Sequence, residues 1–193
     1  MMTAGRMATL PCMADEEPEK TCFVISPIGD EGSEPRGRAD DVLEFVIRAA
    51  LDGLGYQVVR ADEMPNPGEV SPQIVKMLVE ADLVIADLTD SNPNVFYELA
   101  IRHVTKKPCI QLHKSGQNIP FDVAPIRSIP FDIARIRTVE EAKKRIRRAI
   151  AALPEADFEN PVSRAFEIDL LKASPDPERR SRGCDGDGPG SRA

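Results

Sequence analysis

The stretch ADLVIADLTDSNPNVFYELAIRHVTKKPCIQL, residues 81–112, predicts a strand, a turn, a helix and a second strand. Residues 83–86 form an unbroken apolar run, which is typical of a central strand buried on both faces of a parallel sheet. Asn92 and Pro93 are the residues favoured at an N-cap and at the first helical position, so we expect a helix from there to about residue 105. Residues 108–112 predict the next strand.

The same alternation extends to both sides of this stretch. Residues 32–37, with two glycines and a proline, are expected to form a loop that leads to a helix beginning at Asp40 and ending near Gly53. Further apolar runs predict strands, and segments of helical period predict helices: strands at 22–25, 56–59 and 129–132, helices at 71–81 and 138–153, and a weaker helix at 162–171. With right-handed crossovers, this order predicts an α/β fold: a doubly wound, five-stranded parallel sheet in a flavodoxin- or Rossmann-like three-layer sandwich.

The two ends of the chain are expected to be disordered. Residues 1–19 have no continuous apolar stretch of signal-peptide length and are left out of the predicted domain, whereas residues 174–193 are poor in apolar residues that could pack and rich in proline, glycine and charge. We therefore expect one folded domain at residues 20–173.

Charge and cysteine usage exclude several classes of protein. The 25 basic and 32 acidic residues give a net charge of −7, which disfavours nucleic acid as a partner. No apolar run has the length of a signal peptide or a membrane helix. The four cysteines lack a pairing motif or metal-ligand spacing, so we expect a cytoplasmic protein with reduced thiols and no metal: Cys12, Cys22, Cys109 and Cys184. Motifs for triphosphate loops, dinucleotides, zinc proteases and serine hydrolases are also missing, and no cofactor is expected.

The carboxyl ends of the strands are the expected place for a ligand in such a sheet. Three polar segments should meet there, at 26–30, 61–66 and 87–98. Asp87 ends the all-apolar strand and could bind a hydroxyl group or a base edge, although capping of the turn that follows it is an equal alternative.

Glu98 lies about one and a half turns into the helix that follows Asp87. A carboxylate near the positive end of a helix should stay ionised, and it could attack or stabilise a cationic sugar carbon. The alternative is an ion pair with Arg102 at i,i+4.

His103 and His113 are expected to be hydrogen-bonded core residues.

Three stretches resemble the nucleoside 2-deoxyribosyltransferase-like superfamily, a relative of bacterial TIR-like domains: FVISPIGD at 23–30, LDGLGYQVVRADE at 51–63, and the stretch at 81–112. The resemblance implies that Glu98 attacks the anomeric carbon and that Asp87 holds the nucleoside. It also implies that the loop after the first strand borders the sugar, and that a homo-oligomer completes the site. Residues 94–100 lack the Gly-Thr pair before the glutamate, and the glycine after it, that are usual in the transferases. They look more like the version in defence-associated proteins, whose TIR-like relatives act on NAD.

Two functions follow from the residues and the resemblance. The first is cleavage or transfer of an N-glycosidic bond of a nucleoside or nucleotide, with Glu98 as nucleophile. The alternative is a non-catalytic TIR-like module that senses a nucleotide or NAD. In both, the substrate-binding residues are expected to be Ser26, Pro27, Ile28, Gly29, Arg36, Asp62, Thr89, Asn92 and Asn94. An FMN protein is disfavoured, because the first loop lacks the hydroxyl residues that would wrap a phosphate.

Overall fold

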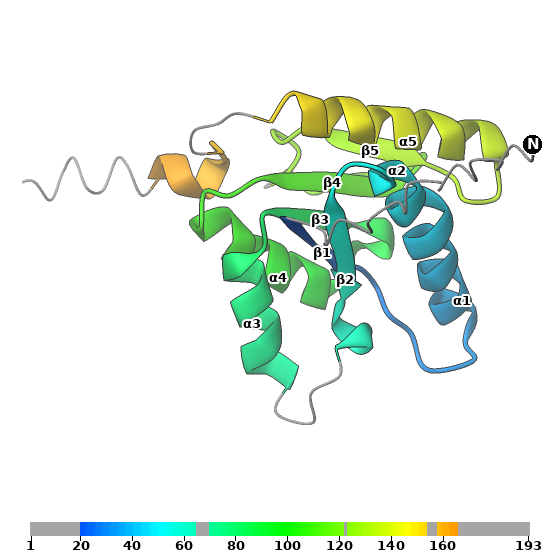
Figure 1. Ribbon diagram of the computed structural model, residues 1–193, viewed down its shortest axis with the longest axis horizontal. Coiled ribbons are helices and arrows are strands. Elements are labelled where there is room, and N and C mark those ends of the chain that lie inside the picture. Colours follow the sequence, from blue (N-terminus) through cyan, green and yellow to red (C-terminus); the bar gives the residue numbers. More distant parts are fainter. Residues whose placement is uncertain (1–19, 65–69, 122, 154–157, 166–193) are drawn as a thin grey trace, which may run out of the picture.

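A single parallel sheet forms the middle layer of the molecule (Figure 1). The computed structural model describes residues 20–64, 70–121, 123–153 and 158–165. Its five strands are β1 Lys20–Ile25, β2 Tyr56–Arg60, β3 Leu83–Asp87, β4 Cys109–Lys114 and β5 Ser128–Phe131. All neighbours are parallel and the order is β2-β1-β3-β4-β5. The predicted doubly wound α/β fold is confirmed, whereas residues 1–19 and 166–193 lie outside the described part.

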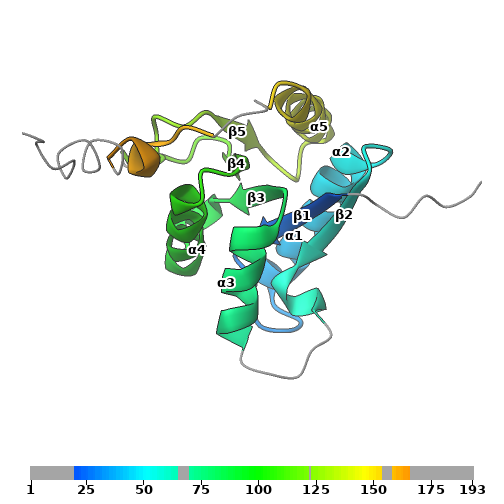
Figure 2. The ribbon, with the colours of Figure 1, turned by 60° about the vertical axis from the view of Figure 1, so that its left-hand side comes forward.

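Helices cover both faces of the sheet (Figure 2). On one face lie α1 Glu34–Asp41, the π-helical η1 Val42–Arg48, α2 Ala49–Leu51 and α5 Ile136–Ala151. On the other lie α3 Val70–Glu80 and α4 Pro93–Val104. None of the described helices combines the length and the apolar character needed to cross a membrane.

The first helix begins earlier than the sequence indicated. Ser33 is its N-cap, and the Ser33 hydroxyl accepts the Arg36 backbone N–H at 3.3 Å. Pro35 lies in the first turn, where its missing N–H leaves no helical hydrogen bond unmade. The expectation of a loop through Pro35 and Gly37 was therefore wrong, because the N-cap lets helix begin at Glu34.

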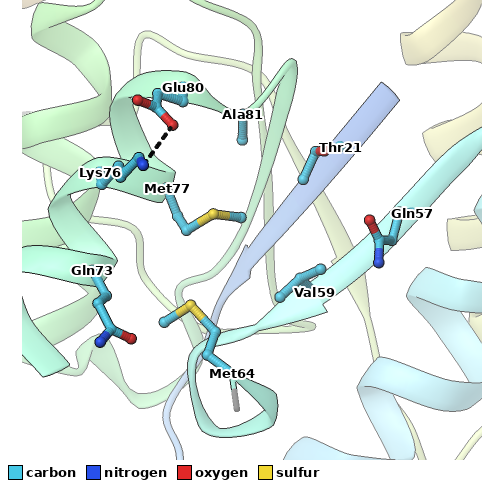
Figure 3. Close-up of a pocket in the computed structure, with 9 residues that line it drawn as sticks. All are labelled: Thr21, Gln57, Val59, Met64, Gln73, Lys76, Met77, Glu80 and Ala81. Atoms are coloured by element: carbon cyan, nitrogen blue, oxygen red, sulfur yellow. Dashed lines mark ion pairs between the residues drawn. The ribbon is translucent and has the colours of Figure 1, made fainter. Parts of the chain in front are cut away.

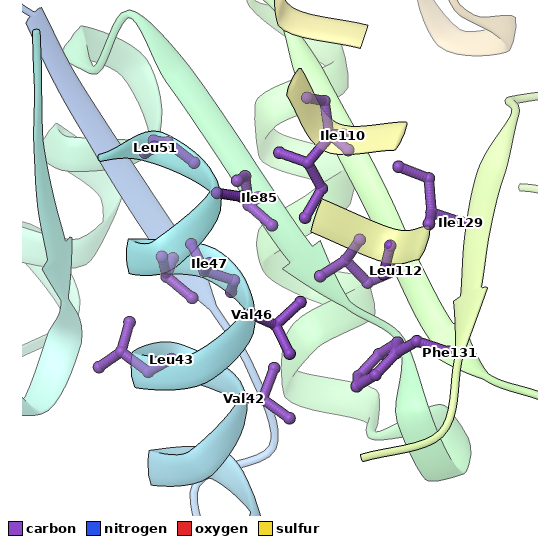
Figure 4. Packing of buried hydrophobic residues seen from close by; sticks show 14 of the residues in the cluster. Val42, Leu43, Val46, Ile47, Leu51, Ile85, Ile110, Leu112, Ile129 and Phe131 are labelled. Atoms are coloured by element: carbon purple, nitrogen blue, oxygen red, sulfur yellow. The ribbon is translucent and has the colours of Figure 1, made fainter. Parts of the chain in front are cut away.

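The core consists of two apolar clusters, one on each face of the sheet, because side chains alternate between the two faces along each strand. Ile85 of β3 packs with Val46 of η1 and Phe131 of β5 on the α1–α5 face (Figure 4). Val84 and Ala86 instead point to the cluster beneath α3 and α4. Because successive strand residues point to opposite faces, Asp87 belongs to the α1–α5 face.

Short polar anchors tie the end of the described chain to α4. The Asn160 side-chain amide donates to the His103 carbonyl at 2.8 Å. The Asn160 side-chain oxygen accepts the backbone N–H groups of Val162 and Ser163, both at 3.0 Å. Residues 161–165 are helical, which agrees with the start of the helix expected there, and the rest of that helix lies outside the described residues.

Candidate functional site

The carboxyl end of β3 is held by a buried ion pair between Asp87 and Arg38. Asp87 is 0% exposed, and the Arg38 guanidinium donates to its Oδ2 at 2.9 Å. The backbone N–H and the hydroxyl of Thr89 donate to Oδ1 at 3.1 and 2.6 Å. Arg38 also donates to the Thr89 hydroxyl at 2.7 Å. Both Asp87 oxygens are therefore engaged within the protein, and Thr89 is itself buried.

The turn after β3 is stabilised from a distant part of the chain. Asp90 and Ser91 adopt φ values of 58° and 52°, in the left-handed region that non-glycine residues rarely occupy. The Gln117 side chain accepts the Asp90 N–H at 3.0 Å and donates to the Leu88 carbonyl at 2.8 Å. These bonds hold the turn so that α4 can begin two residues after Ser91.

Asn92 performs the capping role that the sequence indicated. Its side-chain oxygen accepts the Asn94 backbone N–H at 3.0 Å, and Pro93 is the first residue of α4. Asn94 is exposed one turn before Glu98, so the two residues lie on the same side of the helix.

Glu98 is a half-buried carboxylate that makes no hydrogen bond or ion pair within the described part of the chain. Burial raises its pKa from an ordinary value of 4.5 to about 7. The expectation that Glu98 stays ionised near the helix N-terminus did not take this burial into account, and burial disfavours the charged form of a carboxyl group. Near neutral pH the group exists in both protonation states.

The alternative ion pair between Glu98 and Arg102 is not formed. Arg102 is fully buried and donates instead to the backbone carbonyls of Leu78 and Ala81, each at 2.8 Å, and of Pro108 at 2.9 Å. These bonds fasten α4 to the end of α3. Since Glu98 precedes Arg102 by one turn, it lies on the side of α4 that faces α3.

Asp87 and Glu98 project from opposite layers of the molecule. Asp87 points towards Arg38 of α1, whereas Glu98 belongs to α4, which covers the other face of the sheet. A ligand that contacts both residues would have to lie beyond the carboxyl ends of the strands. The two helical layers meet there, between β1 and β3, where the strand order of the sheet reverses.

The loop after β1 reaches the same edge of the sheet. The Ser26 hydroxyl is buried and has no hydrogen-bond partner among the described residues. A Cβ atom on Gly29 would lie 2.6 Å from the Ser33 hydroxyl and 2.9 Å from the Pro35 Cβ. Glycine is thus required here for close approach to α1, while Ile28 next to it is 36% exposed.

Arg36 and Asp62 belong to a separate charged network at the end of β2. Arg36 pairs with Asp62 at 2.7 Å and with Asp40 at 3.2 Å. Arg60, only 2% exposed, donates to both carboxylates. Burial opposes ionisation of Asp62, yet the hydrogen bonds from Arg60 hold its pKa below the ordinary value. The predicted site residues therefore form two groups, one at β1 and β3 and one at β2.

A cavity of about 510 Å³ lies between α3 and the first two strands (Figure 3). Met64 and Met77 face each other across it, with Thr21 and Gln57 on the sheet side. None of the predicted site residues lines this cavity.

The contacts of three residues around the site were not predicted from the sequence. Arg38, which pairs with Asp87, and Gln117, which holds the turn after β3, were not among the predicted site residues. His113 lies near enough to Asp87 for the carboxylate to act on it. Burial lowers the pKa of His113, and the charge of Asp87 opposes that shift. For none of these residues does a local pattern indicate the contact, because each partner comes from another element.

Comparisons with known proteins add a likeness of fold. No protein-family model and no curated protein matches the chain. Among solved structures, CMP N-glycosidase BcmB of Clostridium botulinum is 15% identical with a TM-score of 0.45, over 66% of this chain and 98% of that chain. The 2-deoxyribosyltransferase of Bacillus psychrosaccharolyticus is 15% identical with a TM-score of 0.46, over 62% and 95% of the two chains. The corresponding values for the Leishmania mexicana enzyme are 17%, 0.40, 57% and 73%. At this low identity, the similarity to these nucleoside 2-deoxyribosyltransferase-like structures is one of fold alone.

Proposed function

We propose that this protein cleaves or transfers the N-glycosidic bond of a nucleoside or nucleotide, with Glu98 as the nucleophile. The observation that carries the proposal is the half-buried carboxylate of Glu98, which no described residue pairs or hydrogen-bonds. A carboxylate used only for structure would be expected to have a partner at this depth. Glu98 also lies in the motif that resembles the deoxyribosyltransferase-like superfamily.

The chemistry would be a double displacement at the anomeric carbon. An ionised Glu98 oxygen forms an ester bond to that carbon as the bond to the base breaks and the base takes up a proton. Water or a second base then attacks the same carbon and releases Glu98. Because only the ionised form can attack, a pKa of about 7 implies that the rate rises with pH through neutrality.

Asp87 would act in this scheme by positioning other groups. With both oxygens engaged by Arg38 and Thr89, it fixes the turn from which α4 begins. The first-loop residues Ser26–Gly29, together with Asn94, would then border the sugar, since they reach the same edge as the start of α4.

Release of free base from a panel of nucleosides, nucleotides and NAD, followed by chromatography, tests the proposal. Wild-type protein should release base from at least one compound, and Glu98→Gln should reduce the rate by about a thousandfold, since it removes the attacking oxygen. Glu140→Gln is the matched control, because this exposed glutamate lies on α5 and its loss should leave the rate unchanged. Equal rates for wild type and Glu98→Gln would refute the role of Glu98.

A second proposal, binding of a nucleotide or NAD without turnover, is favoured by the complete engagement of Asp87 inside the protein. In that case calorimetry would show saturable binding of a panel compound with no base released. Glu98→Gln would then leave the affinity within about twofold, since an uncharged amide of the same shape keeps the site. Turnover by wild type would exclude this second proposal.

A further inference from the structure

A second cavity lies at the end of the sheet opposite to the candidate site. It has a volume of about 590 Å³ and opens at the amino ends of β4 and β5, beneath the last turns of α5. This size lies within the range of pockets that hold small molecules. Its walls are largely aliphatic and include Ile110, Ile126, Ile129 and Leu153, and Phe158 adds an aromatic ring to the lining.

Three arginines line this aliphatic cavity. They are Arg127, which precedes β5, and Arg145 and Arg148 of α5. Arg145 pairs with Glu141 at 3.0 Å. The side chains of Arg127 and Arg148 make no hydrogen bond or direct ion pair within the described part of the chain, although the charge of Arg148 acts on Glu141 from a greater distance. Two guanidinium groups are thus available to an anion at the mouth of an apolar chamber.

We propose that this cavity binds a medium- or long-chain carboxylate, of the fatty-acid class. The aliphatic walls match a hydrocarbon chain, and the arginines match a carboxylate head that accepts two hydrogen bonds. A nucleotide base fits the lining poorly, because its edge also presents donors, the arginines can only donate, and the Ser128 hydroxyl is the one side-chain oxygen in the lining that can accept. Binding here is independent of Glu98, which lies on α4, on the other side of the sheet.

Isothermal titration calorimetry with octanoate tests the proposal on the full-length protein. Octanoate should bind, while 1-octanol and butanoate should each bind at least about tenfold more weakly, since one lacks the charge and the other lacks apolar surface. Inorganic phosphate alone should not bind measurably.

The variant Arg127→Gln/Arg148→Gln should weaken octanoate binding by at least about tenfold, because two charge-assisted hydrogen bonds are lost. Arg137→Gln/Lys144→Gln is the matched control: it removes the same charge from exposed positions of α5 outside the cavity. Absence of octanoate binding, equal affinity for octanol, or an equal effect of the two double variants would each overturn the proposal. Both double variants should release base at the wild-type rate, so the outcome of this experiment is separate from the test of Glu98.

Discussion

Among single residues, Asp87 and Arg38 are 49 residues apart in the chain and form the ion pair on which the turn after β3 depends. The sequence indicated that Asp87 ends a buried strand, and it also indicated the cap at Asn92, since both depend on immediate neighbours. It could not indicate Arg38 as the partner, because that contact exists only after α1 packs on the sheet.

Replacing Arg38 by methionine should strongly destabilise the protein. The change leaves the Asp87 carboxylate buried with only Thr89 as a donor, and loss of one partner of a buried ion pair costs about 3 kcal/mol. Urea unfolding of the variant measures this loss. Arg145→Met, which breaks an exposed ion pair with Glu141, is the control and should cost less than about 0.5 kcal/mol. Similar losses for the two variants would contradict the role given to Arg38.

Glu98 should make stability depend on pH. Its pKa is raised from 4.5 in the unfolded chain to about 7 in the folded protein, so the folded state binds more protons between these values. Stability that Glu98 contributes at low pH is therefore lost as pH rises through this window. Glu98→Gln should be more stable than wild type at pH 8 by on the order of 1–3 kcal/mol, with a smaller difference at pH 4.

Guanidinium chloride unfolding of wild type, Glu98→Gln and the control Glu140→Gln at pH 4 and pH 8 measures this difference. A gap between wild type and Glu98→Gln that does not change with pH would show that Glu98 is not desolvated in the folded protein.

Among the helices and strands, the strands were predicted closely, because unbroken apolar runs bounded by turn residues leave few other assignments of secondary structure. The start of α1 was missed, since Pro35 and Gly37 resemble loop residues unless the Ser33 N-cap is recognised. Placing helix there moves Arg38 from a loop to the last turn of α1, where it reaches β3.

Two glycines near this helix should respond in opposite ways to alanine. Gly29→Ala brings a Cβ to 2.6 Å from the Ser33 hydroxyl, and relief requires the N-cap to move, at a cost of about 1–3 kcal/mol. Gly37→Ala meets nothing within 4 Å inside α1 and should stabilise the protein by about 0.5–1 kcal/mol. Thermal unfolding distinguishes the two, and a stabilised Gly29→Ala variant would contradict the close packing of the loop on α1.

Across the whole molecule, the doubly wound, five-stranded parallel sheet was predicted from the alternation of strands and helices with right-handed crossovers, but the division of side chains between the two faces was not used to place the site. Asp87 and Glu98 show why this division matters. They lie on either side of the same turn in the sequence, yet they belong to layers on opposite faces of the sheet. Asp62 likewise belongs to a charged network at β2 that lies apart from the turn after β3.

The core on the α1–α5 face should carry much of the stability. Ile146 of α5 is fully buried in that cluster, and Ile146→Ala should cost about 2–5 kcal/mol. Ile136, at the start of the same helix, is 81% exposed, and Ile136→Ala should cost less than about 0.5 kcal/mol. Chemical denaturation of the two variants compares one residue type on one helix. Equal losses would show that α5 does not pack on the sheet as described.

The most direct test of the proposed role of Glu98 is the rate of base release as a function of pH, for wild type and Glu98→Gln, on the panel compound that turns over. The wild-type rate should rise as pH increases through about 7, where Glu98 loses its proton, and Glu98→Gln should be about a thousandfold slower at every pH. A wild-type rate that is flat or falls across this range, or a variant as fast as wild type, would contradict the assignment of Glu98 as nucleophile.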